Sequence, residues 1–154
     1  MLKKLVGTIW RTMPRFLRAR AIRLTQTKFT VSVAAVVMDA EGKVLLLDHV
    51  FRPGSGWGIP GGFVNQGEQP EQAIRRELEE ETGLRLENIK LFRARILKSH
   101  VEFIFEAQAK GIGEVSSREI LAVEWFALGE MPEEMSAMQK ATVREVLNCR
   151  KTKS

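Results

Sequence analysis

The sequence predicts a single domain in which strands and helices are mixed, as in an α+β or α/β sandwich. Three observations lead to this fold class. The chain has 154 residues, enough for one hydrophobic core. Stretches rich in β-branched residues alternate with amphipathic helical segments along most of its length. Its apolar fraction of 44% and charged fraction of 28% are typical of a globular protein.

Residues 1–28 form a basic arm that differs from the rest of the chain. Its apolar residues recur at helical spacing, and Pro14 would break a continuous helix, so we expect two short helices with a joint near residues 12–13. Of the 24 Lys and Arg residues, eight lie in this arm, which leaves 16 to oppose the 19 acidic residues elsewhere. The net charge of +5 therefore comes from the arm and does not indicate a nucleic-acid-binding domain. The eight cations are Lys3, Lys4, Arg11, Arg15, Arg18, Arg20, Arg23 and Lys28.

The strands and helices of the domain itself are predicted within residues 29–150. Residues 29–39 and 43–50 are expected to pair as a β-hairpin around a short turn. A loop rich in Gly and Pro follows at 51–62, with a brief extended piece at 57–60. The later elements are expected as strands at 89–98, 101–110 and 120–128, an amphipathic helix at 135–150, and a disordered tail at 151–154.

Cysteine usage and hydropathy indicate the compartment. The single cysteine, Cys149, excludes an internal disulfide framework and fits a reducing environment. No apolar run approaches the roughly 18 residues that cross a bilayer. The first residues make a poor signal peptide, because Arg11 interrupts their apolar stretch. We therefore expect a cytoplasmic protein.

A cluster of glutamates lies in a predicted helix at residues 70–82. Pro70 suits the first turn of a helix, and Gly83 offers the left-handed residue that ends one. Glu77, Glu80 and Glu81 stand at positions i, i+3 and i+4, so their carboxylates share one face. No lysine is interleaved with them, and a divalent cation would relieve their repulsion. From spacing alone, a metal site and a solvated acidic face remain equally open.

The full pattern resembles a complete Nudix box. It comprises Gly62, Glu68 after five intervening residues, and "RELEEETGL" at 76–84 after seven more. The segments "WGIPGG" before the box and "REILAVEWFALGEMP" after it are also similar to Nudix domains, and the arm lies outside the resemblance. The resemblance implies an α/β/α sandwich around a mixed β-sheet, to which the helical arm is added.

The same resemblance implies a chemistry, the hydrolysis of the pyrophosphate link in a nucleoside diphosphate joined to another group. This reaction requires neutralised charge on two phosphates and an activated water, and Mg²⁺, with Mn²⁺ as a substitute, supplies both. By analogy with the box, the residues expected to hold the ion are Glu77, Glu80 and Glu81, with the Gly61 carbonyl and Glu68 as further ligands.

Two other roles follow from the resemblance. Arg76 is expected to orient the carboxylates through hydrogen bonds. The general base is expected to be Glu80, Glu81 or Glu119, the last of which lies in the region similar to the family's later loop. An ordinary surface acid at a strand edge is an equally open interpretation of Glu119.

Substrate contacts are expected from the loop before the box. Arg52 could grip a phosphate with two hydrogen bonds, and Trp57 could stack on a base or simply pack beneath the loop. Markers of several Nudix subgroups are absent, which leaves a nucleoside diphosphate sugar or an ADP-ribose-like compound as the favoured substrate. The alternatives are a nucleoside triphosphate or oxidised nucleotide and, from another class, a non-catalytic nucleotide-sensing module.

The apolar face of the arm needs a surface to cover it. We expect a homodimer in which the arm packs against the other subunit. Packing on its own domain and binding to a membrane surface are the alternatives, with membrane association disfavoured. No nucleic-acid partner is expected, and the substrate is a nucleotide-derived small molecule.

Overall fold

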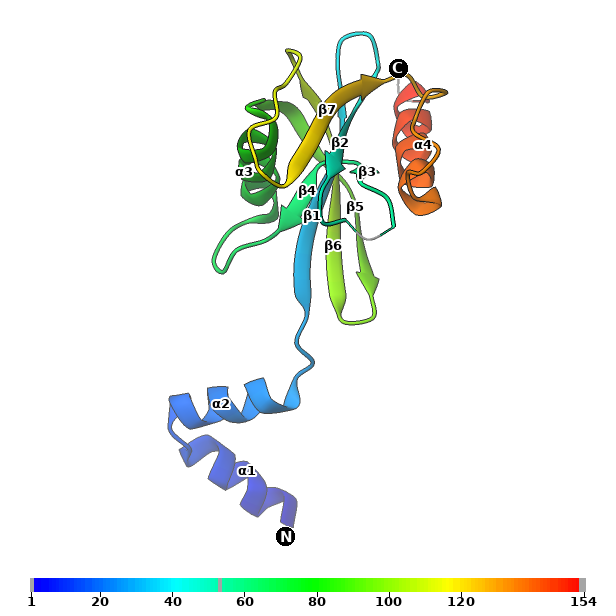
Figure 1. Cartoon of the computed structure of the whole chain (residues 1–154). Helices are drawn as coiled ribbons and strands as arrows, with labels where there is room; N and C mark the ends of the chain where they lie inside the picture. Colours follow the sequence, from blue (N-terminus) through cyan, green and yellow to red (C-terminus); the bar gives the residue numbers. More distant parts are fainter. Residues whose placement is uncertain (1, 53, 153–154) are drawn as a thin grey trace.

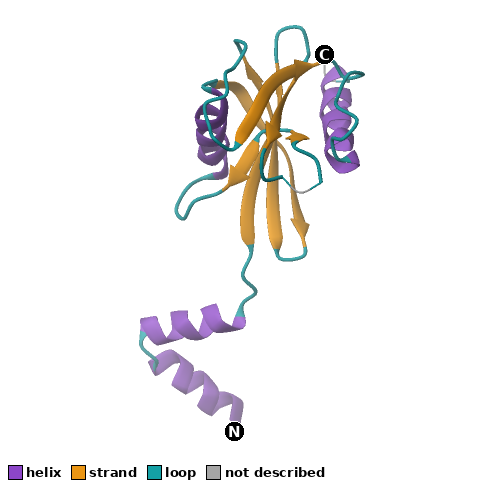
Figure 2. Ribbon diagram, in the orientation of Figure 1, coloured by secondary structure: helices purple, strands orange, loops and turns teal. Residues whose placement is uncertain are grey.

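The computed structural model describes residues 2–52 and 54–152, which form a layered domain and a separate helical arm. A sheet lies between two helices, α3 (Pro70–Thr82) on one face and α4 (Ala137–Lys151) on the other (Figures 1 and 2). This arrangement confirms the predicted α/β sandwich with an added N-terminal arm. Helix α4 includes Lys151, where the sequence predicted the tail to begin, and residues 153–154 lie outside the described part.

The sheet is mixed, with strands in the order β3-β2-β1-β6-β5, while β4 pairs with β1 and β7 pairs with β2. The central pair is parallel, with Val33 of β1 opposite Phe103 of β6. The other neighbouring strands are antiparallel. The strands are β1 (Thr30–Met38), β2 (Val44–His49), β3 (Trp57–Gly58), β4 (Gly61–Phe63), β5 (Leu86–Leu97), β6 (His100–Ala109) and β7 (Ile120–Phe126).

The predicted hairpin forms only at its turn. Strands β1 and β2 pair antiparallel at Met38 and Val44 and then separate. Beyond that point β1 pairs with β4 and β6, and β2 pairs with β3 and β7. Both strands are buried on both faces, which favours central places in a sheet over an isolated hairpin.

Strand β5 begins at Leu86, three residues before its predicted start at 89. The pairing with β6 shifts register between Glu87 and Lys90, where Asn88 adopts a left-handed conformation with φ 51°. A bulge of this kind inserts an unpaired residue and lets the strand continue. The alternation of apolar and polar residues therefore breaks at this position, which hides the start of the strand in the sequence.

Each face of the sheet carries its own hydrophobic core. On one face, Ile74 and Leu78 of α3 pack on alternate residues of β1 and β2. On the opposite face, Val143 and Val146 of α4 pack on the residues between them. Because α3 is fixed by a fully buried apolar side, its polar side has a defined orientation relative to the sheet.

The arm consists of α1 (Leu2–Thr12) and α2 (Arg15–Thr25), with Pro14 between them. Figure 1 shows both helices beyond one end of the sheet, joined to β1 by a short extended segment. None of the described side chains of the arm is buried. In the described residues, no helix is long and apolar enough to cross a membrane. The expected homodimer through the arm stays a prediction.

Candidate active site

Helix α3 spans the predicted 70–82. Pro70 is its first residue, and the side chains of Gln69 and Gln72 form a reciprocal capping box with the backbone. Gly83 ends the helix in the left-handed region with φ 70°. These local signals place the carboxylate-bearing face beside β4 and the loop that precedes the helix.

Arg76 gathers three of the predicted carboxylates. Its Nε donates to Oε1 of Glu68 at 2.8 Å, and its Nη1 donates to Glu77 at 2.9 Å and to Glu80 at 3.2 Å. Its Nη2 also donates to the carbonyl oxygen of Phe63 at 3.1 Å. The hydrogen bond from Arg76, helped by one from the backbone, lowers the pKa of Glu68 to about 2. Arg76 therefore holds three carboxylates relative to β4, and its role in orienting them for catalysis stays a prediction.

Glu81 is not among the carboxylates that Arg76 contacts, and only 8% of its surface is exposed. Its Oε2 is buried and accepts no hydrogen bond within the described part of the chain. Burial, with a further contribution from Glu77, raises the pKa of Glu81 to about 8. A buried carboxylate without a partner is costly unless it holds a proton or contacts a cation.

The charge of Glu81 is not balanced by its neighbour His49. The Nδ1 of His49 is 3.8 Å from Oε1 of Glu81, too far for a hydrogen bond. Burial and Arg52 lower the pKa of His49 to about 4, so its ring is neutral at physiological pH. Since Nη2 of Arg52, which can only donate, is 2.9 Å from Nε2 of His49, the ring proton resides on Nδ1.

Two glycines permit the close packing of the glutamates against the sheet. A Cβ on Gly62 would lie 2.2 Å from the carboxyl carbon of Glu77. A Cβ on Gly61 would lie 2.2 Å from the carbonyl oxygen of Val33 in β1. Only glycine can occupy these positions without displacing its neighbours.

A hollow of about 250 Å³ opens beside Glu81. Gly61, Arg52 and Glu119 line it together with His49 and Phe51. The backbone N–H of Val50 donates to the carbonyl oxygen of Glu119 at 2.9 Å, which ties the segment before β7 to the end of β2. The charge of Glu119 is close enough to contribute to the raised pKa of Glu81.

Arg52 separates this hollow from a second one of about 420 Å³, which Trp57 and Gln139 line. Its guanidinium donates to the carbonyl oxygen of Ile59 at 3.1 Å and to Oε1 of Gln139 at 3.5 Å. In the described residues it forms no ion pair with a carboxylate. Its positive charge is therefore available to an anion.

Trp57 is half-buried and packs edge-to-face on Phe126, with ring centroids 5.2 Å apart. It contributes to the core on the α4 face and also lines the second hollow. The packing of Trp57 is therefore observed, and its contact with a substrate stays a prediction.

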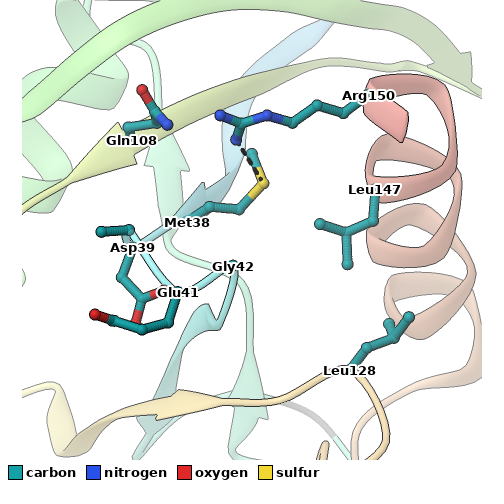
Figure 3. A pocket seen from close by; sticks show the side chains of 9 residues that line it. Met38, Asp39, Glu41, Gly42, Gln108, Leu128, Leu147 and Arg150 are labelled. Carbon is teal, nitrogen blue, oxygen red and sulfur yellow. Dashed lines mark hydrogen bonds between the residues drawn. The ribbon is translucent and has the colours of Figure 1, made fainter. Parts of the chain in front are cut away.

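A larger cavity of about 510 Å³ lies at the C-terminal end of β1, where Met38 lines it (Figure 3). Met38, Leu128 and Leu147 provide apolar walls, and Arg150 crosses it toward the Met38 sulfur at 3.2 Å. None of the predicted site residues lines this cavity. Its size alone therefore does not make it the active site, whereas three of the predicted site residues, Arg52, Gly61 and Glu119, line the hollow of about 250 Å³.

Comparison with known proteins identifies the family. The chain matches the NUDIX domain over residues 28–146. The chain belongs to the Nudix family. A MutT-like protein of Streptomyces ambofaciens is 32% identical to this Nudix chain over 121 residues, which cover 77% of each chain. The resemblance of the box is thereby confirmed.

Two further comparisons bear on this Nudix domain. The NAD-capped RNA hydrolase NudC of Photobacterium profundum is 30% identical over 116 residues, but the match spans 73% of this chain and only 42% of that relative. The structure of a MutT NUDIX hydrolase from Burkholderia pseudomallei superposes with a TM-score of 0.67 at 29% identity, covering 77% of this chain and 98% of that one. Fold and family therefore agree.

The donor set of this Nudix site suits a hard divalent cation, although the side chains are not arranged to hold one as they stand. Within residues 2–52 and 54–152, no three acidic, histidine or cysteine side chains converge in a ready-made metal site. Arg76 occupies oxygens of Glu77 and Glu80, whereas the free Oε2 of Glu81 is a buried acceptor without a donor. Carboxylate oxygens are the ligands that Mg²⁺ prefers.

Two residues of the site, His49 and Gln139, are not among the site residues predicted from the sequence. His49 was given no role, yet it contacts Arg52 and faces Glu81. Gln139, in the first turn of α4, accepts from the Ile59 backbone at 3.2 Å and from Arg52. No spacing rule links these residues to the box, because loop closure and the packing of α4 bring them there.

Proposed function

We propose that this Nudix pyrophosphohydrolase cleaves the pyrophosphate bond of a nucleoside diphosphate linked to another moiety, in a Mg²⁺-dependent reaction. The observation that carries the proposal is the unpartnered carboxylate of Glu81, buried beside two further glutamates and next to a hollow that Arg52 lines. Such a site combines a place for a cation with a place for an anionic group.

The residues of α3 provide the cation ligands in this proposal. Glu77, Glu80 and Glu81 hold the ion, with the Gly61 carbonyl and Glu68 as additional ligands. Mg²⁺ in this position supplies neutralising charge to two phosphates and favours ionisation of water. Arg76 keeps the carboxylates in place, and it would have to release its contacts with Glu77 and Glu80 for their oxygens to hold the ion.

The proton of the attacking water passes to a carboxylate. Glu81 and Glu80 lie on α3 itself, and Glu119 reaches the same hollow from the segment before β7. Burial raises the pKa of Glu81, which strengthens it as a proton acceptor when the protein is free of metal. A cation held by Glu80 and Glu81 would remove that property from both, so Glu119 would serve as the base when both glutamates are ligands.

In this proposal the substrate occupies both hollows. Arg52 lies between them and offers a guanidinium without a carboxylate partner, the group that binds phosphate with two parallel hydrogen bonds. The phosphates lie beside Arg52 and the glutamates, and one terminal group of the substrate lies beside Trp57 and Gln139. We favour a nucleoside diphosphate sugar or an ADP-ribose-like compound as the substrate.

A capped RNA end is a second candidate substrate, because it also contains a pyrophosphate bond. NudC of Photobacterium profundum is named an NAD-capped RNA hydrolase, and NAD is a dinucleotide joined through a pyrophosphate. Nucleoside triphosphates and oxidised nucleotides remain alternative substrates. A non-catalytic sensor is disfavoured, since the chain retains every carboxylate of the box.

The test is product analysis with nucleotide sugars, ADP-ribose, dinucleotides, NAD-capped RNA and nucleoside triphosphates, each with Mg²⁺ and with EDTA. Glu80→Gln should reduce turnover at least about a hundredfold, because the isosteric amide loses the charge that binds the cation. Glu79→Gln is the matched control, since Glu79 lies on the same helix but pairs with Arg85 at the surface. If Glu80→Gln retains more than about a tenth of the wild-type activity, the metal-site assignment is wrong.

A further inference from the structure

Helix α1 presents an apolar face that nothing in the described chain covers. At 100° per residue, its central apolar side chains fall within an arc of about 140°, and the lysines, arginine and threonines occupy the rest of the circumference. The apolar side chains are also exposed: Leu5 by 60%, Val6 by 57%, Ile9 by 53% and Trp10 by 40%. Helix α2 adds Arg15, Arg18, Arg20 and Arg23 around its circumference.

The catalytic domain does not bury this face. Both helices lie beyond the end of the sheet (Figure 1), and the side-chain hydrogen bonds of their threonines are all to carbonyl groups within the same helix. Packing on the chain's own domain, one of the alternatives that the sequence left open, is therefore not what the structure shows.

The positive charges of the arm limit which kinds of partner can cover the apolar face of α1. Residues 1–28 contain eight cations and no acid. In two α1 helices packed through their apolar faces, Lys4 and Arg11 would lie on the side of the helix opposite the contact, and neither copy would supply a carboxylate to pair with them. An 11-residue helix also provides few turns for a stable helix pair. The partner must therefore offer a broad apolar layer edged by negative charge.

We propose that the arm binds the surface of an anionic lipid bilayer. The apolar face of α1 lies at the boundary between headgroups and acyl chains, Lys3 contacts anionic headgroups at the edge of that face, and Lys4 and Arg11 on the opposite side add long-range attraction to the anionic surface. Trp10 lies at one edge of the apolar arc, the position in which an amphipathic ring meets the interface. The arginines of α2 add electrostatic attraction, and the catalytic domain remains outside the membrane, joined through residues 26–29.

The test uses the full chain and vesicles, and it is independent of hydrolysis. The protein is sedimented with vesicles of phosphatidylcholine alone and with vesicles that also contain phosphatidylglycerol, at low and high salt. We expect binding only to the anionic vesicles, with a loss of binding as salt rises. Ile9→Glu should weaken that binding at least about tenfold, because it puts a carboxylate in the centre of the apolar face.

Ile112→Glu is the matched control. It is the same substitution with the same change of net charge, at a residue that is 83% exposed in a loop of the catalytic domain. It should bind anionic vesicles like the wild type. Equal binding by Ile9→Glu and Ile112→Glu would mean that charge alone attracts the arm and would overturn the proposed insertion of its apolar face.

Tryptophan emission gives a second, residue-specific measurement. Trp57 and Trp125 are half-buried in the domain, so a blue shift on addition of anionic vesicles should come from Trp10 and should disappear in Trp10→Phe. A second copy of the chain is the competing occupant. Absence of vesicle binding, together with a wild-type dimer that Ile9→Glu dissociates in light scattering, would overturn the proposal in favour of the homodimer.

Discussion

At the scale of single residues, the structure separates carboxylates that look alike in the sequence. Glu77 and Glu80 are held by Arg76, Glu79 forms a surface pair with Arg85, and Glu81 is buried without a hydrogen bond at Oε2. These surroundings, rather than the residue type, decide which group can exchange a proton or accept a cation.

Glu81 should make the metal-free protein less stable as pH rises. Its folded pKa of about 8 exceeds its ordinary value of 4.5, so the folded state retains a proton that the unfolded chain has lost. The pKa of His49 is lowered from its ordinary value of 6.5 to about 4. Above pH 6.5 its ring is therefore neutral in both the folded and the unfolded state, and His49 does not contribute to the pH dependence of stability. Between pH 6.5 and 8 the free energy of unfolding should therefore fall with pH in EDTA.

Urea denaturation of the wild type and of Glu81→Gln across that pH range measures this effect. The variant lacks the titrating group, so its advantage in stability should grow as pH rises. Mg²⁺ favours the ionised carboxylate and should reverse the trend in the wild type alone. A difference between the two proteins that is independent of pH would contradict a raised pKa at Glu81.

A catalytic pH profile should have its optimum above neutrality. The attacking water must lose a proton beside several carboxylates, and their negative charge opposes this step. Initial rates at saturating Mg²⁺, measured from pH 5 to pH 10, check this expectation on either side of the folded pKa. An optimum below about pH 6 would indicate a protonated general acid and a different mechanism.

At the scale of elements, α3 has two faces with separate roles. Ile74 and Leu78 are fully buried against the sheet, Glu81 is buried on the same helix, and Glu80 is exposed. The buried face fixes the rotation of the helix about its axis and thereby aims the carboxylates at β4. Strand β4 carries the two glycines that allow their close approach.

Truncation of the buried face should cost stability. Ile74→Ala leaves a cavity between α3 and the sheet and should lower the free energy of unfolding by about 2–5 kcal/mol. Glu79→Ala on the exposed side of the same helix should change it by less than about 1 kcal/mol, because surface ion pairs contribute little. Denaturant titrations of both variants provide the comparison.

Gly62→Ala should impair metal binding more than folding. The added Cβ would meet the end of the Glu77 side chain, which can rotate away at the expense of its place in the site. We expect the Mg²⁺ concentration for half-maximal activity to rise by about tenfold or more. Gly129→Ala is the control, since a Cβ there meets nothing within 4 Å. An unchanged Mg²⁺ requirement in Gly62→Ala would remove Glu77 from the proposed ligands.

At the scale of the whole molecule, the arm and the catalytic domain are structurally independent. The family match begins at residue 28, and both hydrophobic cores consist of residues beyond the arm. The sheet and its two covering helices are therefore complete without α1 and α2.

Deletion of residues 1–26 should leave the catalytic domain folded. We expect its melting temperature to change by less than about 2 °C, because no core residue is lost. Differential scanning calorimetry of the full-length and truncated proteins measures the change. A fall of more than about 5 °C would indicate that the arm packs on the domain in solution.

The sequence by itself determined the elements whose signals are local. Pro70 and Gly83 mark the bounds of α3, and the spacing of Glu77, Glu80 and Glu81 places them on one side of it. The box pattern was sufficient to predict the family and the mixed α/β sandwich. Helical periodicity and Pro14 likewise predicted the two helices of the arm.

Only the tertiary structure decided which of these groups meet. The separation of β1 from β2, the bulge in β5, the arrival of His49, Arg52 and Glu119 near Glu81, and the contact of Gln139 with Arg52 depend on contacts between residues far apart in the chain. Burial depends on the same contacts, because a side chain loses water only when distant elements close over it. The sequence was therefore sufficient to predict the carboxylates, whereas the packing of distant elements determined the burial of Glu81.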